Sequence, residues 1–208
     1  MARLPENTLL YHITHITNLQ SIIEQGALMS HARIRLNTLS YKDVANQDVQ
    51  SRRNRTRIPV GTGGNLHDYV PFYFAPRSPM LYVLYMQQIP QDDLVYLMTN
   101  TEVVQRQCPN FVFTDAHAIR RLTNFFTDLE DLNRIDWGTM RATVWTDTDE
   151  DPNRKARRQA EFLVHNDVPL SACIGFAVYS VETKQKVEAM LKEAGLSLPV
   201  AGRRQFYF

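Results

Sequence analysis

The stretch from His67 to Met80 reads HDYVPFYFAPRSPM and combines closely spaced aromatic rings with prolines. Aromatic residues favour strands and proline interrupts them, so the pattern predicts a short buried strand at residues 72–75. A strand this rich in rings is usually part of a hydrophobic core, but it can also be a wall that stacks a planar ligand ring. The stretch by itself leaves both interpretations open.

Outward from this stretch, strands are predicted at residues 9–13, 94–98, 162–164, 174–179 and 207–208. Capping boxes at Thr17 and Ser40 predict helices that begin there, and Gly26 ends the first of them. A further amphipathic helix is predicted at residues 182–194. Strands and helices do not alternate regularly, and no G-x-G-x-x-G motif opens a helix after a strand. The sequence therefore favours a mixed α+β fold over a Rossmann fold.

The composition bounds the class of protein. With 208 residues and 44% hydrophobic content, the chain can fill one sizeable core, so a single domain over residues 1–208 is expected. Cys108 and Cys173 are too few for a disulfide framework, which favours reduced thiols in a cytoplasmic protein. The N-terminus has no apolar signal region, and no apolar run is long enough to cross a membrane. The turn signal at Thr14 to Thr17 argues against a shared metal-binding face for His12 and His15, so no metal site is expected.

Arginine is concentrated in two parts of the chain, although the formal net charge is only +1. The clusters consist of Arg52, Arg53, Arg55 and Arg57, and of Arg154, Lys155, Arg157 and Arg158. A total charge near zero argues against a globally basic nucleic-acid-binding protein, but local clusters can still hold phosphates. They can equally form a solvated surface, and the sequence leaves both alternatives open.

Glu161 is a lone carboxylate between the second arginine cluster and the apolar run at residues 162–164. A site that holds an anionic ligand and presents one carboxylate to a developing cation would show this pattern. A solvated helix end would show it as well. Glu161 is therefore a candidate catalytic residue rather than an assigned one.

Four segments, taken in order, resemble the DarT family of DNA ADP-ribosyltransferase toxins from DarT–DarG toxin–antitoxin systems. The segments are residues 11–14 (YHIT), 50–53 (QSRR), 67–80 and 159–164 (QAEFLV), and the resemblance extends from about Leu9 to Val178. More distantly, Tyr73-Phe74-Ala75 followed by Ser78 is similar to the core strand of poly(ADP-ribose) polymerases. The resemblance implies an α+β ADP-ribosyltransferase fold, in which central mixed β-sheets flanked by helices form an NAD cleft.

The resemblance also implies a reaction and its partners. ADP-ribose would pass from NAD to a base in single-stranded DNA, most typically thymine at N3 and within a specific sequence, with release of nicotinamide. The partners would be NAD, single-stranded DNA and a DarG-like macrodomain antitoxin, with no metal and no membrane. Two other classes stay open: a non-enzymatic single-strand-binding protein, and an NAD glycohydrolase or protein-modifying transferase with the same cleft.

Site residues follow from the resemblance residue by residue. Glu161 would stabilise the oxocarbenium-like ribose and accept the thymine proton, and Arg52 would stabilise negative charge on the base. Arg52 is chosen over its neighbour Arg53 within residues 50–53. The expected NAD-binding residues are His12, Ile13, Thr14, Asn18, Gly26, Leu28, Arg52, Phe72, Tyr73 and Phe74. The expected DNA-binding residues are Tyr41, Arg53, Arg55, Arg77, Arg154 and Arg158.

Overall fold

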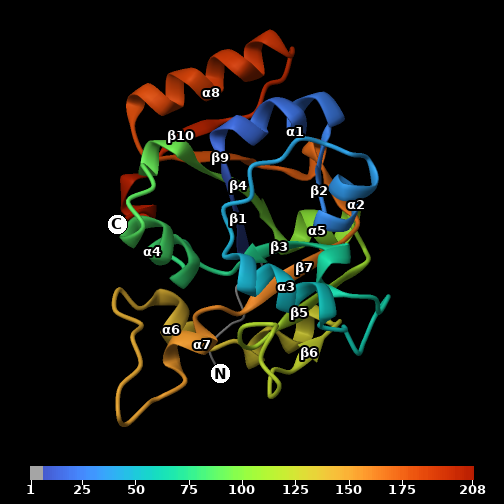
Figure 1. Ribbon diagram of the computed structural model, residues 1–208, viewed down its shortest axis with the longest axis vertical. Coiled ribbons are helices and arrows are strands. Elements are labelled where there is room, and N and C mark those ends of the chain that lie inside the picture. The colour runs from blue at the N-terminus through green and yellow to red at the C-terminus, as the bar shows by residue number, and fades with distance from the viewer. Residues whose placement is uncertain (1–6) are drawn as a thin grey trace.

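The computed structural model describes residues 7–208, and its centre is an eight-stranded mixed sheet (Figure 1). The strand order is β10-β9-β4-β1-β3-β7-β5-β6, and a second sheet pairs β2 with β8. Neighbours in the large sheet are antiparallel except β9 and β10, which are parallel. The strands are β1 (Leu9–His15), β2 (Ala27–Met29), β3 (Tyr69–Tyr73), β4 (Leu94–Asn100), β5 (Phe111–Thr114), β6 (Phe125–Phe126), β7 (Glu161–His165), β8 (Asp167–Pro169), β9 (Gly175–Val178) and β10 (Val200–Gly202).

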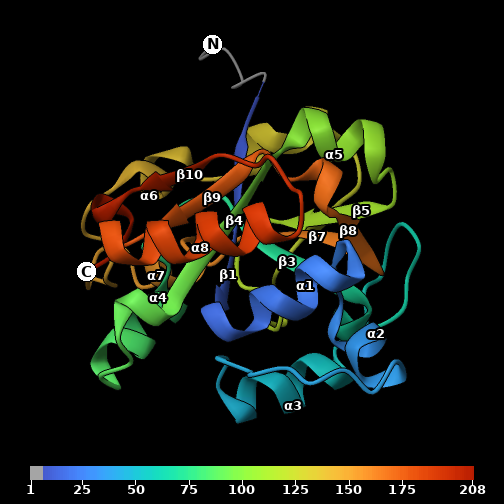
Figure 2. The same ribbon diagram turned by 90° about the horizontal axis from the view of Figure 1, so that it is seen from above.

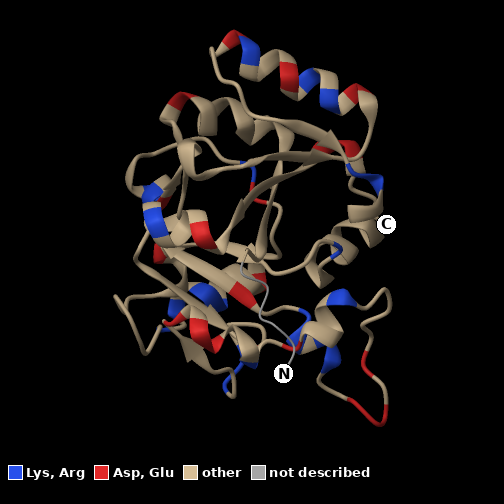
Figure 3. Ribbon diagram, turned by 180° about the vertical axis from the view of Figure 1, so that it is seen from behind, with Lys and Arg blue, Asp and Glu red and all other residues tan. Residues whose placement is uncertain are grey.

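Helices cover both faces of the large sheet (Figure 2). The α-helices are α1 (Leu19–Gln25), α2 (His31–Leu36), α3 (Gln47–Arg55), α4 (Pro79–Met86), α5 (Thr101–Gln107), α6 (Trp137–Arg141), α7 (Arg154–Arg157) and α8 (Val181–Glu193). Buried residues of α1, α5 and α8 pack into the largest core, whereas Leu81 and Leu84 of α4 pack into a second core with Tyr207. Basic and acidic residues are interspersed along α8, as Figure 3 shows, and its outer side is therefore a mixed-charge surface.

The structure confirms part of the predicted element order and corrects the rest. The helix that ends at Gly26 and the helix at residues 182–194 are present as α1 and α8. The helix predicted at Ser40 is wrong, because Asn46 caps α3 by accepting from the backbone N–H groups of Asp48 and Val49. The last strand is β10, and residues 207–208 lie beyond it.

The large sheet splits between β1 and β3, and this split creates the main cleft. The two strands are in register only at Tyr11 and Tyr73. Beyond that pair, the His12 side chain reaches across the gap, and its Nδ1 lies 2.8 Å from the backbone oxygen of Pro71. The His12 side chain therefore takes the place of a backbone hydrogen bond between the two strands at the point where they diverge.

Candidate active site

The main cleft at the split has a cavity volume of about 100 Å³, and the space between its walls is about 790 Å³ when the part open to solvent is included. Its lining includes Glu161, Arg53, His117 and Tyr73, the residues Tyr41, His31, Ile34 and Met29, and His12 and Ile13 of β1. The cleft thus joins segments from all four sequence regions that suggested the family resemblance.

Glu161 is the first residue of β7 and lies opposite Tyr73 of β3, with only 1% of its surface exposed. Arg53 Nη1 donates to its carboxylate at 2.6 Å, and the backbone N–H of Ala118 donates at 3.1 Å. Burial raises the pKa of Glu161, but the Arg53 charge, His117 and these hydrogen bonds together outweigh it and lower the pKa below its ordinary value. The carboxylate is therefore ionised at neutral pH.

Arg53, on α3, is nine-tenths buried and carries a donor that has no partner. Its Nη2 atom makes no hydrogen bond to any of residues 7–208 although it is shielded from solvent. A buried charged donor without an acceptor is costly, so this atom is suited to a ligand oxygen in the cleft.

His12 presents a second unpartnered atom to the same cleft. Because its Nδ1–H donates to the Pro71 oxygen, Nε2 carries a lone pair, and Nε2 is buried with no partner in the described part of the chain. Burial lowers the pKa of His12 to about 4, so the ring is neutral. The cleft therefore contains an orphaned donor and an orphaned acceptor, which together match a ligand with both carbonyl or phosphate oxygens and hydroxyl groups.

Thr14 and Asn18 support the far wall of the cleft. Asn18 Nδ2 donates to the Thr14 hydroxyl at 2.9 Å and to the Lys42 oxygen at 3.0 Å, and the Lys42 N–H donates back to Asn18 Oδ1 at 2.8 Å. These bonds fix the segment before α3, which carries Tyr41 into the cleft. Tyr41 was expected to bind DNA, but the structure places it in this wall, where burial raises its pKa to about 12.

Strand alternation in β3 corrects the predicted aromatic wall. Pro71 and Tyr73 line the cleft, whereas Phe72 and Phe74 are buried in the largest core on the opposite face. Tyr73 is therefore the ring next to Glu161. Gly26 and Leu28 do not line the main cleft either: Gly26 ends α1 with a φ of 66°, and Leu28 lines a smaller hollow beside Asn18 and Tyr41.

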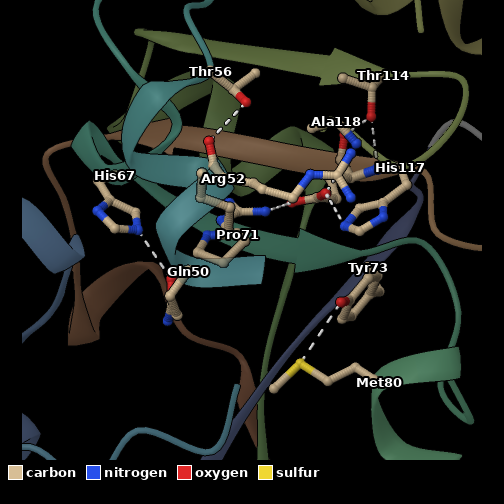
Figure 4. Close-up of polar contacts among 12 residues, drawn as sticks. Gln50, Arg52, Thr56, His67, Pro71, Tyr73, Met80, Thr114, His117 and Ala118 are labelled. Carbon is tan, nitrogen blue, oxygen red and sulfur yellow. Dashed lines mark hydrogen bonds and ion pairs between the residues drawn. The ribbon is translucent and has the colours of Figure 1, made fainter. Parts of the chain in front are cut away.

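Arg53, rather than Arg52, pairs with the carboxylate, and the choice of Arg52 as the catalytic arginine that acts on the base stays a prediction. Arg52 is exposed and lines a second hollow beside the main cleft, which we call the side hollow. The side hollow lies between α3 and α4, and it shares Tyr73, Met80 and His117 with the main cleft. Figure 4 shows His117 and Ala118 on one side of this region and Tyr73 with Met80 on the other.

The structure separates the residues that were expected to bind DNA. Arg53 is occupied by Glu161, and Arg158 is 5% exposed and donates to the backbone oxygens of Thr139, Met140 and Pro76 at 2.8, 2.5 and 2.7 Å. The Arg77 guanidinium lies 4.6 Å from the centre of the Phe208 ring. These three side chains make contacts within the fold, and their assignment to DNA phosphates stays a prediction.

Among the predicted DNA-binding arginines, Arg55 is exposed, and Arg77 and Arg154 are partly exposed. The sequence interpretation also missed residues that the structure brings to the side hollow. They are Met80, Val83, Gln87, His117, Lys155 and Gln159. Gln159 and Lys155 could have been found from their nearness to Glu161 in sequence, but His117 had no motif to mark it.

The buried neutral state of His12 makes the stability of the fold depend on pH. Its pKa is about 4 in the folded protein and 6.5 ordinarily, so the unfolded chain binds the proton first as pH falls. The contribution of neutral His12 to the free energy of unfolding is fully present above about pH 6.5 and decreases as the pH falls toward about 4. Between about pH 7.5 and about pH 5 we expect His12 to account for a loss of ~2 kcal/mol. Urea unfolding of the wild type and His12→Gln measures this, and equal pH dependence in both would contradict it.

Comparison with known proteins identifies the family to which the chain belongs. A protein-family model described as "ssDNA thymidine ADP-ribosyltransferase, DarT" matches residues 11–208. The chain belongs to the DarT family. A DNA ADP-ribosyl transferase of Thermus sp. (strain 2.9) is 39% identical over 193 residues, which cover 91% of this chain and 90% of the relative. A DNA ADP-ribosyl transferase of Escherichia coli is 34% identical, with 98% and 95% covered.

Solved DarT structures share the fold described above. The Thermus sp. 2.9 DarT in complex with ADP-ribosylated ssDNA superposes with a TM-score of 0.92 at 36% identity and covers all of both chains. The same protein in complex with NAD+ gives a TM-score of 0.87, covering 99% of this chain and all of the other. The expected ADP-ribosyltransferase fold is thereby confirmed. Within residues 7–208, no helix has the length and apolar character needed to span a membrane.

Proposed function

We propose that this protein transfers ADP-ribose from NAD to a thymine in single-stranded DNA and releases nicotinamide. The observation that carries the proposal is the ionised Glu161 buried in a cleft that also holds the unpartnered atoms of Arg53 and His12. Membership of the DarT family supports the same reaction, because that family is described by this activity. The two unpartnered atoms also fit the oxygens and hydroxyl groups of NAD.

In this proposal NAD lies along the main cleft with its nicotinamide ribose at Glu161. The bond between the ribose C1′ and the nicotinamide nitrogen breaks, and nicotinamide leaves with the bonding electrons as a neutral molecule. The Glu161 carboxylate faces the positive charge that develops on the ribose and stabilises it. His12 Nε2 accepts a hydrogen bond from a ribose hydroxyl, and Arg53 Nη2 donates to an oxygen of NAD. Tyr73 flanks the nicotinamide ring.

The side hollow is the proposed site of the acceptor base. It adjoins the main cleft at Tyr73 and His117, so a base there would lie next to the nicotinamide ribose that we place at Glu161. Burial lowers the pKa of His117, as do Arg53 and Arg52, and only Glu161 opposes them, so the imidazole is neutral and can accept a proton.

His117 Nε2 lies 3.8 Å from a Glu161 oxygen, which would stabilise the imidazolium formed. We therefore assign the proton from thymine N3 to His117 rather than directly to Glu161. As the new C1′–N3 bond forms, Arg52 at the edge of the hollow stabilises the negative charge on the base oxygens.

A macrodomain antitoxin that removes ADP-ribose from DNA is the proposed protein partner. A Thermosipho africanus relative is named a DNA ADP-ribosyl transferase-DNA ADP-ribosyl glycohydrolase fusion protein, and it is 32% identical over 121 residues. That match covers 58% of this chain and 30% of the fusion. Transfer to DNA and its reversal would take place in the cytoplasm, where we place this protein.

The decisive assay incubates the protein with NAD alone, with NAD and a single-stranded oligonucleotide, and with NAD and the matching duplex. Nicotinamide release and the intact mass of the DNA are measured. We expect the single strand to gain one ADP-ribosyl group, and the duplex to be protected because pairing and stacking shield the base. Nicotinamide release without DNA modification would indicate a glycohydrolase, and binding without either would indicate a single-strand-binding protein.

A further inference from the structure

Helix α3 carries Arg53 but has no apolar anchor. Arg53 itself is the residue of α3 that is buried, and Val49 is only partly buried. A short helix is normally held by an apolar face that packs on the protein, since its own backbone bonds are marginal in water. Polar contacts must therefore hold α3 in place, at the outer edge of the molecule where Figure 2 shows it.

A backbone bond from the Leu66 N–H to the Thr56 oxygen, at 3.0 Å, holds the chain at the end of α3. Two side-chain contacts hold the helix itself, and they lie one turn apart on the same side of it: Arg53 binds Glu161, and Gln50 binds a set of polar residues. His67 Nε2 lies 2.9 Å from Gln50 Oε1, and Gln50 Nε2 donates to Asp43 at 2.7 Å. Figure 4 shows the contact between His67 and Gln50. His31 Nδ1 lies 3.1 Å from His67 Nδ1. We call Asp43, Gln50, His67 and His31 the polar bridge.

The Asp43 carboxylate, at one end of the polar bridge, fixes which group donates in each of its hydrogen bonds. Asp43 can only accept, so the Gln50 nitrogen faces it and the Gln50 oxygen is left to accept from His67. His67 therefore carries its proton on Nε2 and has a lone pair on Nδ1. His31 must then donate from Nδ1. The bridge thus links the segment before α3, α3 itself, the turn before β3 and α2 in one ordered set.

The polar bridge needs a neutral His67. A second proton on His67 would put an N–H on its Nδ1, facing the His31 Nδ1–H only 3.1 Å away, and the bond between the two rings would be lost. Burial, together with His31, Arg53 and Arg35 and against the opposing charge of Asp43, lowers the pKa of His67 to about 4. The pKa of His31 is also lowered, first by burial and then by Arg35 and Arg53 against Asp43. The charges around the pair therefore support the neutral state at neutral pH.

We propose that His67 is a positioning residue for the transfer reaction, and that it acts by holding Gln50 so that α3 keeps Arg53 against Glu161. The proposal rests on the function proposed above, because Arg53 and Glu161 are assigned their roles there. The polar bridge contacts no reacting atom in that scheme. Its effect on the reaction passes through the placement of α3.

The first test replaces His67 with phenylalanine, which keeps a flat ring and removes both hydrogen bonds. We expect kcat/KM for NAD to fall by about 10- to 100-fold, because small displacements of a catalytic group have effects of this size. His165→Phe is the matched control, since that ring also packs on an aromatic side chain, Tyr69, but lies outside the cleft. It should leave kcat/KM within about twofold. An unchanged kcat/KM in His67→Phe would overturn the proposal.

A double-mutant cycle separates positioning from general destabilisation. If His67 acts through Arg53, then adding His67→Phe to Arg53→Lys should lower kcat/KM by less than about threefold beyond Arg53→Lys alone. If the loss of kcat/KM in the double variant equals the product of the losses in the two single variants, His67 acts independently of Arg53 and the proposal fails. Gln50→Leu, at a partly exposed position on α3, should reproduce the effect of His67→Phe, and it serves as the test if His67→Phe does not fold.

Measuring NAD affinity by calorimetry shows whether a negative result contradicts the positioning role of His67 or the proposed function. If the wild type binds NAD but does not modify DNA, the function is wrong, and the same cycle is measured on NAD affinity instead. If the wild type modifies DNA and the losses of kcat/KM in the two single variants multiply in the double variant, only the positioning role is wrong.

Discussion

Replacing Glu161 with glutamine is expected to leave NAD binding intact and to reduce ADP-ribose transfer by about three orders of magnitude, or ~4 kcal/mol. Glutamine keeps the shape of the side chain and still offers an oxygen to Arg53 Nη1. It removes the negative charge that faces the developing cation, so the loss falls on the transition state rather than on the bound substrate. NAD affinity by calorimetry and transfer by DNA mass measure the two effects separately.

Glu182→Gln is the matched control, because Glu182 lies exposed at the start of α8, outside the lining of the cleft. It removes the same charge and should leave transfer unchanged. Transfer by Glu161→Gln at a rate close to that of the wild type would remove Glu161 from the mechanism. A large loss of NAD affinity would instead place the carboxylate in ground-state binding.

Arg53→Met and Arg52→Met are expected to differ sharply although the two residues are neighbours. Arg53→Met leaves the Glu161 carboxylate buried without its cation, and breaking such a pair costs about 3 to 5 kcal/mol. We therefore expect a lower Tm and the loss of both nicotinamide release and DNA transfer. Arg52 is exposed, so Arg52→Met should keep the wild-type Tm and slow transfer to DNA far more than hydrolysis of NAD.

Thermal unfolding, nicotinamide release and DNA mass, measured side by side, compare the two variants. The contrast itself is the test, since each variant is the control for the other. If Arg52→Met lost NAD hydrolysis and transfer equally, Arg52 would act on NAD and the side hollow would not be the acceptor site. A wild-type Tm and activity for Arg53→Met would show that the ion pair at 2.6 Å contributes nothing.

The sequence was enough to identify Glu161 as a candidate catalytic residue and to find the family resemblance. It was not enough to predict which face of a strand each neighbouring residue lies on. In β3, both sides of the strand are apolar, so alternation separates Phe72 from Tyr73 without saying which of the two faces the cleft. The answer comes from the pairing of Tyr73 with Tyr11 and Glu161 on either side. Strand register is a tertiary property, and a single sequence with apolar residues on both faces does not encode it locally.

The arginines show a second limit. Arg154 and Arg158 belong to one cluster in the sequence, yet Arg154 is partly exposed and Arg158 is buried among backbone oxygens. Nothing local distinguishes them, because the oxygens that bind Arg158 come from residues 76 and 139–142. The same applies to Arg52 and Arg53, which differ only in the direction that α3 gives to each side chain. Elements whose signals are local, such as α1 with Gly26 and α8, were predicted correctly.

The most direct test of the central claim concerns one atom of the acceptor base. A single-stranded oligonucleotide with one thymine and its twin with 3-methylthymine are each incubated with NAD and the protein, and their intact masses are compared. The methyl group blocks N3 but preserves the phosphates and most of the stacking face, so both strands should bind with similar affinity. We predict the addition of one ADP-ribosyl group to the thymine strand and none to its twin. Equal modification of the two strands would show that thymine N3 is not the acceptor.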